Sequence, residues 1–187
     1  MIPSVKRCFN LMEIHRMPEH IMNHSVMVAK IARLLTRSLE SGGYVLSVER
    51  ATAGALLHDI GKISALKAGG DHCELGRMIC LEEHCDEIAE IVSRHVRFAA
   101  TAIPETISEE EIVYYSDKRV KHDQVVPLEE RLDYIIERYG RNNDKIKELI
   151  RANFSMCRVV EERLFSTLSF GPDAISSLAA GEILPLD

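Results

Sequence analysis

Apolar residues recur every three or four positions along most of the chain, which is the spacing of one buried face of an α-helix. In residues 19–40 this face is made by Ile21, Val28, Ile31 and Leu35. No stretch of useful length shows the alternation of apolar and polar residues that is typical of a β-strand. The pattern therefore predicts an all-α fold, with further helices over residues 48–61, 72–83, 86–97, 109–121, 128–139 and 143–168.

The length of 187 residues predicts a single domain, a helical bundle with helices added at its C-terminal side. Gly171-Pro172 ends the last long periodic segment, and the residues after it predict a short helix at most in a loosely held tail. The longest helix, over 143–168, could pack on its own domain or form a homodimer. The expected parts are an N-terminal helical extension over 1–18, a core over 19–125, C-terminal helices packed on the core over 126–170, and the tail over 171–187.

Composition agrees with a globular protein, with 46% hydrophobic and 28% charged residues. The sequence has no apolar run of about 18 residues, so it predicts no membrane span, and the first 20 residues lack the apolar stretch of a secretory signal. The five cysteines are odd in number and form no Cys-x-x-Cys motif, which indicates reduced thiols rather than disulfides. These features predict a cytoplasmic protein.

Charge narrows the class of partner. There are 23 Lys and Arg against 29 Asp and Glu, a formal net charge of −6, which argues against nucleic acid as the main partner. A small anionic substrate is compatible with that charge only if a metal ion or a few well-placed cations create local positive charge.

Several polar side chains fall on the faces that should be buried. His24 lies three residues after Ile21 and four before Val28, and His58, His95 and Asp117 occupy similar positions in three other helices. Any one of them alone is more simply interpreted as a hydrogen-bonded core residue. Together, four helices that each point a metal-competent group inward predict one shared divalent cation, because burying such groups without partners is unfavourable.

The most specific motif is the adjacent pair His58-Asp59 in the segment ALLHDIGK. With His24 in HSVMVAKIA before it and Asp117 in VYYSDKRV after it, this order resembles the HD-domain superfamily of metal-dependent phosphohydrolases. The resemblance spans roughly residues 20–125, so the core over 19–125 is the expected HD domain. It implies an all-α HD fold in which the principal metal ion is held by His24, His58, Asp59 and Asp117.

In relatives that hold two metals, additional histidines lie between His-Asp and the last Asp. His72 and His95 occupy such positions and are candidates for a second site. The second position is usually a His-His pair, whereas here Val96 follows His95, so one ion is expected and a second is left open. A shell of imidazoles and carboxylates suits Fe, Mn, Zn, Co or Ni, and Mg less well.

Hydrolysis of a phosphate ester requires charge neutralisation and a hydroxide at neutral pH, and a divalent metal ion supplies both. Asp59 could orient the attacking water or take its proton, and Lys62 is placed, as the resemblance also implies, to contact a phosphate. Further candidates for binding substrate oxygens are Arg97, Lys118 and Arg119. The loop over 98–108 could cover the site.

These residues predict a metal-dependent phosphohydrolase, a phosphomonoesterase or phosphodiesterase, that acts on a nucleotide or a related small phosphoester. The alternative is a non-catalytic, metal-holding HD module that binds a nucleotide as a sensor or partner domain. A third possibility is a helical scaffold whose histidines are only core residues, and that scaffold would carry no metal.

Overall fold

The computed structural model describes residues 1–98 and 106–186, and this part of the chain is almost entirely helical, as predicted. The loop predicted over 98–108 lies largely outside the described residues. In chain order the elements are α1 (Val5–Ile14), α2 (Glu19–Ser41), α3 (Val48–Leu57), α4 (Lys62–Ala68), α5 (His72–Glu82), α6 (Asp86–Arg94), α7 (Glu109–Lys118), β1 (Val120–Lys121), β2 (Gln124–Val125), α8 (Leu128–Ile135), the π-helical turn η1 (Ile136–Gly140), α9 (Asp144–Phe165), the 3-10 turn η2 (Pro172–Ala174) and α10 (Ile175–Ala180).

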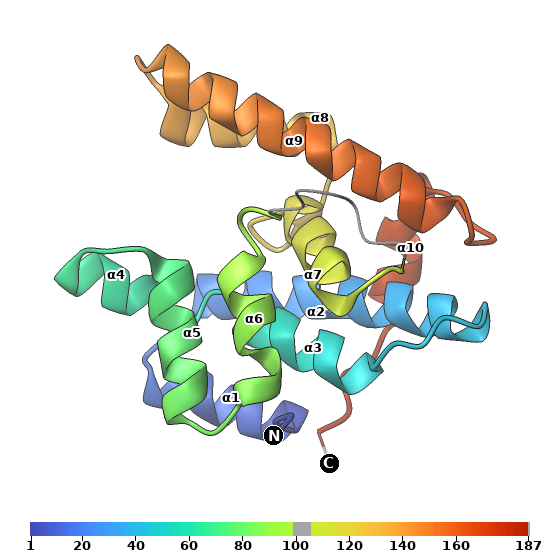
Figure 1. Ribbon diagram of the computed structural model, residues 1–187, viewed down its shortest axis with the longest axis horizontal. Coiled ribbons are helices and arrows are strands. Elements are labelled where there is room, and N and C mark those ends of the chain that lie inside the picture. Colours follow the sequence, from blue (N-terminus) through green and yellow to red (C-terminus); the bar gives the residue numbers. More distant parts are fainter. Residues whose placement is uncertain (99–105, 187) are drawn as a thin grey trace.

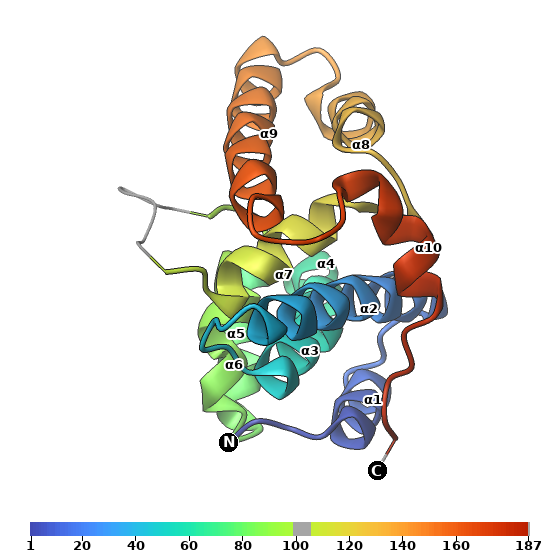
Figure 2. The same ribbon diagram turned by 90° about the vertical axis from the view of Figure 1, so that its right-hand side faces the viewer.

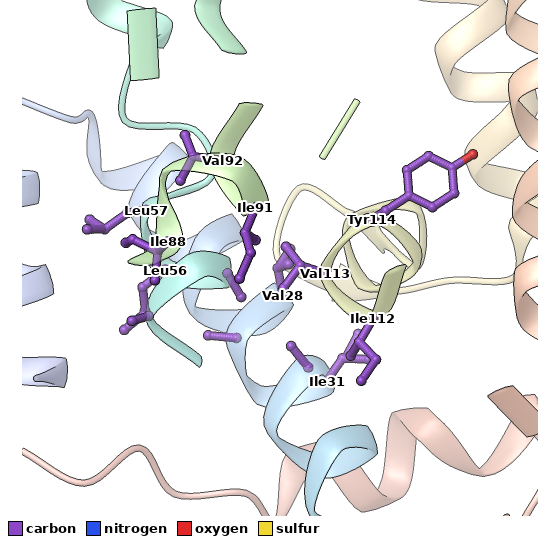
Figure 3. Close-up of a cluster of buried hydrophobic side chains, with 14 of the residues drawn as sticks. Val28, Ile31, Leu56, Leu57, Ile88, Ile91, Val92, Ile112, Val113 and Tyr114 are labelled. Atoms are coloured by element: carbon purple, nitrogen blue, oxygen red, sulfur yellow. The ribbon is translucent and has the colours of Figure 1, made fainter. Parts of the chain in front are cut away.

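Helix α2 runs through the middle of the molecule, between α3 and α7 (Figure 1). Its apolar face, including Val28 and Ile31, is fully buried. Figure 3 shows these side chains meeting residues from three other helices: Leu56 from α3, Ile91 from α6 and Val113 from α7. One continuous core therefore holds together the helices that carry the predicted ligands.

Hydroxyl or carboxylate side chains cap several of the helices. Ser47 accepts a hydrogen bond from the backbone N–H of Arg50 at the start of α3, as its position predicts. Asp71 caps α5 in the same manner, and Ser108 caps α7, whose first turn is acidic. These caps fix the residue at which each helix begins. They thereby also fix which residues lie at the other end of that helix.

Two predicted helices end earlier than expected. The helix predicted over 48–61 stops at Leu57, and a new short helix, α4, begins after the turn that contains Gly61. The helix predicted over 109–121 stops at Lys118, and the chain then makes a two-stranded hairpin in which Val120 pairs with Val125. Strands of two residues are too short to produce an alternating pattern, so periodicity could not predict them.

The C-terminal helices α8 and α9 lie across α7, on the side away from α1 (Figures 1 and 2). The inner face of α9 is buried within the same chain through Phe154, Cys157, Val160 and Leu164.

The short helix that the sequence predicts after Gly171-Pro172 is present as α10, but this helix is not loosely held. Helix α10 packs on α2 and buries Ile175 and Ala179 completely, while Glu182 pairs with Arg33 of α2. Ile175 and Ala179 are four residues apart, which gives even a short helix one apolar edge. None of the described helices is both long and apolar enough to cross a membrane.

Candidate metal centre

The structure brings the four predicted principal ligands together from three helices and one turn. His24 comes from α2, His58 and Asp59 from the end of α3, and Asp117 from the last turn of α7. His24 Nε2 lies 3.0 Å from Asp117 Oδ1, and His58 Nε2 lies 3.2 Å from Asp59 Oδ2 and 3.7 Å from Asp117 Oδ1. Ligand atoms of His24, His58 and Asp59 all lie within 4.8 Å of one another.

Backbone carbonyls fix the orientation of three imidazoles at this centre. The Nδ1 atoms of His24, His58 and His95 lie 2.8, 2.7 and 2.7 Å from the carbonyl oxygens of His122, Ala55 and Val92, respectively. A carbonyl only accepts, so each Nδ1 carries a proton, and Nε2 is the ring atom through which each imidazole, once deprotonated there, can bind a metal ion. This second contact is the arrangement that holds a metal-binding histidine in place.

All three Nε2 atoms point at carboxylate oxygens. His24 faces Asp117, His58 faces both carboxylates, and His95 Nε2 lies 3.4 Å from Asp59 Oδ1. A neutral ring would face a carboxylate oxygen as acceptor to acceptor; although burial opposes it, Asp59 raises the pKa of His58, as expected where only a proton can stand between the two groups. Within the described residues, His58 Nε2 and Asp59 Oδ1 are buried and have no hydrogen-bond partner. Buried acceptors of this kind require a cation between them. The residues present therefore fit a divalent metal ion bound through nitrogen and oxygen.

Both carboxyl groups are charged in this setting. Burial alone would raise the pKa of Asp59, but His58 and Lys62 outweigh it and hold that pKa well below its usual range. For Asp117, burial is likewise outweighed, by the Lys118 charge and the hydrogen bond with His24, and its pKa is also held well below the usual range. Ionised carboxylates are the form that binds metal.

Glycine at position 61 is required by close packing rather than by its backbone angles. A Cβ added to Gly61 would lie 2.1 Å from the carbonyl oxygen of His72 and 2.5 Å from the backbone nitrogen of Gly76. The glycine thus lets the start of α5 lie directly against the turn after Asp59. This contact brings His72 to the same centre as the pair His58-Asp59.

The candidates for a second ion, His72 and His95, lie on the far side of Asp59. His72 Nε2 is 3.8 Å from Asp59 Oδ1, and the His72 and His95 ring centres are 5.3 Å apart. Burial, followed by the neighbouring His95, lowers the pKa of His72 to about 4, so its imidazole is neutral at pH 7. Cys73, which the sequence did not single out, also lies here, with its Sγ 3.7 Å from His72 Nε2. In the sequence, the position of Cys73 beside His72 was the only feature that could have indicated this location.

The four predicted substrate-binding cations have different surroundings. Lys62 Nζ lies 2.5 Å from Asp59 Oδ2, and its side chain is 37% exposed. Arg97 is exposed just beyond α6. Lys118 is buried, and its ammonium bonds to Asp117 Oδ2 at 3.2 Å and to the carbonyl oxygen of His95. Lys118 therefore joins two ligand-bearing segments and is not free to bind substrate.

Arg119 is not at the centre at all. Its guanidinium is buried and donates to the Val126 and Pro172 carbonyls, the Tyr115 hydroxyl and the Glu161 carboxylate. The prediction that Arg119 binds substrate is therefore dropped, since the hydrogen-bonding capacity of its guanidinium is used within the fold. A residue with no predicted role takes the nearer position: Arg131 of α8 has its Nη2 3.9 Å from Asp117 Oδ1. Only the packing of α8 over the core creates that proximity.

Comparison with known proteins agrees with this geometry. The family model for the HD domain matches residues 21–121. An uncharacterized protein of Methanocaldococcus jannaschii, MJ0778, is 29% identical over 72% of this chain and 86% of its own length.

Two other relatives are longer proteins of which this chain spans only a part. A tRNA (cytidine(56)-2'-O)-methyltransferase of Thermoplasma volcanium is 27% identical over 67% of this chain and 41% of its own length. A ribonuclease Y of Fervidobacterium nodosum is 38% identical over 41% of this chain and 14% of its own length. No solved structure matched. The HD domain match covers more than half of the chain and includes His24, His58, Asp59 and Asp117, and we conclude that the chain belongs to the HD domain family.

Proposed function

We propose that this protein is a metal-dependent phosphohydrolase that acts on a nucleotide or a related small phosphoester. One observation carries the proposal: three imidazoles, fixed through Nδ1, point Nε2 at two ionised carboxylates, of which Asp59 is buried and Asp117 is 13% exposed. A fold gains nothing from that arrangement unless a cation occupies it. Membership of the HD family, whose members are generally hydrolases, supports the same conclusion.

A bound divalent cation would supply positive charge for a phosphoryl oxygen and lower the pKa of a coordinated water. His24, His58, Asp59 and Asp117 would hold it. Because its pKa is held low, Asp59 is a weak base, which favours a role as ligand and in orienting water over one as proton acceptor. Lys62, bonded to Asp59 Oδ2 and partly exposed, can turn its remaining N–H donors to a phosphate.

The charge of the centre favours a small anion as substrate. Asp59 and Asp117 supply two negative charges, and Lys62, Lys118 and Arg131 supply three positive ones. A divalent ion would make this centre strongly positive within a chain whose formal net charge is −6. Local positive charge within a negative surface suits a compact phosphate ester better than a long polyanion. Two of the relatives have names that refer to RNA, so RNA is the appropriate competing substrate.

The test is a panel of phosphoesters run on protein reconstituted with Mn, Fe, Zn, Co or Ni. The panel comprises nucleoside mono-, di- and triphosphates, an aryl phosphate, an aryl phosphodiester and a short RNA. Hydrolysis of a small ester that depends on added metal supports the proposal. Asp59→Ala is expected to lose activity and bound metal together while its circular dichroism stays helical.

Two results would contradict the proposal. Full activity of Asp59→Ala would exclude the assigned centre. Metal and nucleotide binding without turnover of any ester would identify the alternative, a non-catalytic HD module that acts as a sensor or partner domain.

A further inference from the structure

Arg131 is a nearly buried cation beside the metal centre, and its guanidinium makes no hydrogen bond inside the described part of the chain. Its side chain is 12% exposed, and its closest acidic oxygen is Asp117 Oδ1, at 3.9 Å from Nη2. That distance exceeds a hydrogen bond. A guanidinium has five N–H donors, and those of Arg131 are not sealed from solvent, so a ligand at the centre can reach them.

Asp117 is not available to satisfy Arg131. Its Oδ1 atom already lies 3.0 Å from His24 Nε2, and its Oδ2 atom accepts from Lys118. Arg119 shows what a structural arginine looks like in the same fold, because its guanidinium donates to four different oxygen-bearing residues. The contrast indicates that the partner of Arg131 is a ligand and not a protein group.

The ring of Tyr134 holds Arg131 in position. The Arg131 guanidinium carbon lies 5.4 Å from the centre of that ring, one helical turn further along α8. A guanidinium held against an aromatic ring keeps the edge that carries its N–H donors free, and this edge matches two oxygens of a phosphate. Lys62 approaches the carboxylates from α4, so the two cations come from different parts of the chain.

Tyr134, which packs against Arg131, also lines a hollow of about 280 Å³ together with Glu137, Arg138 and Arg141. Tyr134 connects it to the metal centre, since its ring centre lies 5.3 Å from that of His122, whose carbonyl oxygen accepts from His24. Tyr134 and Arg138 are joined by a 3.1 Å hydrogen bond. An aromatic ring with guanidinium groups around it is a surface on which a nucleobase can stack.

From these contacts we propose that Arg131 binds the phosphoryl group of the substrate and that the hollow at Tyr134 receives its base. The substrate is then a nucleoside monophosphate or a close analogue, and α8 with η1 is its specificity element. This inference rests on the proposed function and deepens it. Arg131 contacts substrate oxygens, so it is a binding residue, while Tyr134 selects the leaving group.

The first experiment measures binding of inorganic phosphate to the metal-loaded protein by calorimetry, without catalysis. Arg131→Gln is expected to bind phosphate about tenfold to hundredfold more weakly, because it loses charge-assisted hydrogen bonds. Arg131→Lys, which keeps the charge but not the planar fork, should fall between. The control is Arg158→Gln, since Arg158 forms an exposed ion pair with Glu129, between α9 and α8, and should behave as wild type. Elemental analysis should find wild-type metal content in all variants.

The second experiment compares KM and kcat for adenosine 5′-monophosphate and ribose 5-phosphate. Tyr134→Leu should raise KM for the nucleotide about tenfold more than it raises KM for ribose 5-phosphate, which has no base and is affected only through the loss of the ring that supports Arg131. An equal change for both substrates would overturn the role of the hollow.

Three further results separate the possible failures. Wild-type phosphate affinity in Arg131→Gln would overturn the role of the arginine, as would loss of metal from that variant, which would make Arg131 a support for Asp117. A wild-type protein that does not bind phosphate would overturn this inference. One that binds phosphate in an Arg131-dependent way but hydrolyses no ester would overturn only the proposed function.

Discussion

Charge is buried in two regions of this molecule, and the regions differ in what their polar atoms lack. At the interface of α7 with the C-terminal segment, Arg119 donates to Glu161, the Tyr115 hydroxyl accepts from Arg119, and that hydroxyl donates to Glu161 at 2.6 Å. Each of these donors meets an acceptor. At the metal centre, the buried atoms that have no partner among the described residues are His58 Nε2 and Asp59 Oδ1, which are both acceptors once His58 is neutral.

That difference distinguishes a structural network from a binding site. A network of donors and acceptors completes itself on folding and contributes to stability and specificity. A group of acceptors is complete only with an added cation. Helical periodicity indicates only that a polar residue is buried, and burial alone does not distinguish the two regions. They are distinguished by which atom of each polar pair donates and which accepts.

The largest predicted effect is the loss of metal binding in His58→Gln. Loss of an outer-shell partner weakens metal binding by about 10- to 100-fold, and loss of a ligand should exceed that. In wild type, metal at about 100 times its Kd should raise the free energy of unfolding by about 2.7 kcal/mol, and this gain should vanish in the variant. Denaturant titrations with and without metal provide the measurement.

The matched control for His58→Gln is His20→Gln, on the exposed side of α2 one turn before His24. It should keep the metal-dependent gain. If both variants lost the gain, the effect would come from the substitution of histidine in general and the centre would be misassigned.

The second prediction concerns the self-contained network. Arg119→Ala removes one partner of a buried pair, which leaves the Tyr115 hydroxyl without the donor it accepts from and Glu161 without its charged partner. It should lower the free energy of unfolding by about 3 kcal/mol and leave the metal stoichiometry unchanged. Arg158→Ala, which breaks an exposed pair, should cost less than about 1 kcal/mol. Loss of metal from folded Arg119→Ala would show that the two regions are coupled.

The same contrast explains how much the sequence could predict. Periodicity located the main helices, and the motif His58-Asp59 together with His24 and Asp117 predicted residues that the fold does bring together. The periodic pattern could not show that the side chains of Lys118 and Arg119 make hydrogen bonds within the described fold while that of Arg131 makes none. Their roles depend on which acceptors lie opposite them, and those acceptors come from α9, the hairpin and the packing of α8. The periodic pattern also overextended α3, because a close approach between Gly61 and α5 is a tertiary contact.

The third prediction uses that close approach. In Gly61→Ala the new methyl group would overlap the His72 carbonyl and the Gly76 backbone, so α5 must move away from the turn. We expect a loss of about 1–3 kcal/mol in the free energy of unfolding. Gly171→Ala is the control, because a Cβ there meets nothing within 4 Å. Equal stability of the two variants would show that the turn and α5 are not held in contact.

The smallest effect tests the incomplete end of the α7–α9 interface. Glu111 and Arg163 are 3.6 Å apart, and their buried charged atoms make no hydrogen bond within the described residues. Unlike the acceptors at the metal centre, they are an acceptor and a donor, so they need only each other. Burial raises the pKa of Glu111 above its ordinary 4.5, although Arg163 opposes the shift.

A raised pKa in the folded state means that the fold favours protonated Glu111, so this stabilisation is present below pH 4.5 and is lost as pH rises through the folded pKa. Glu111→Gln cannot lose it. The difference in unfolding free energy, variant minus wild type, should therefore rise across that window by about 1.4 kcal/mol for each unit by which the pKa is raised. Denaturant titrations at several pH values measure this difference, and a difference that does not change with pH would contradict the assignment.

Replacing the pair by Glu111→Leu with Arg163→Met should be neutral or stabilising, because two apolar side chains need no partner, whereas no such exchange could preserve the metal centre.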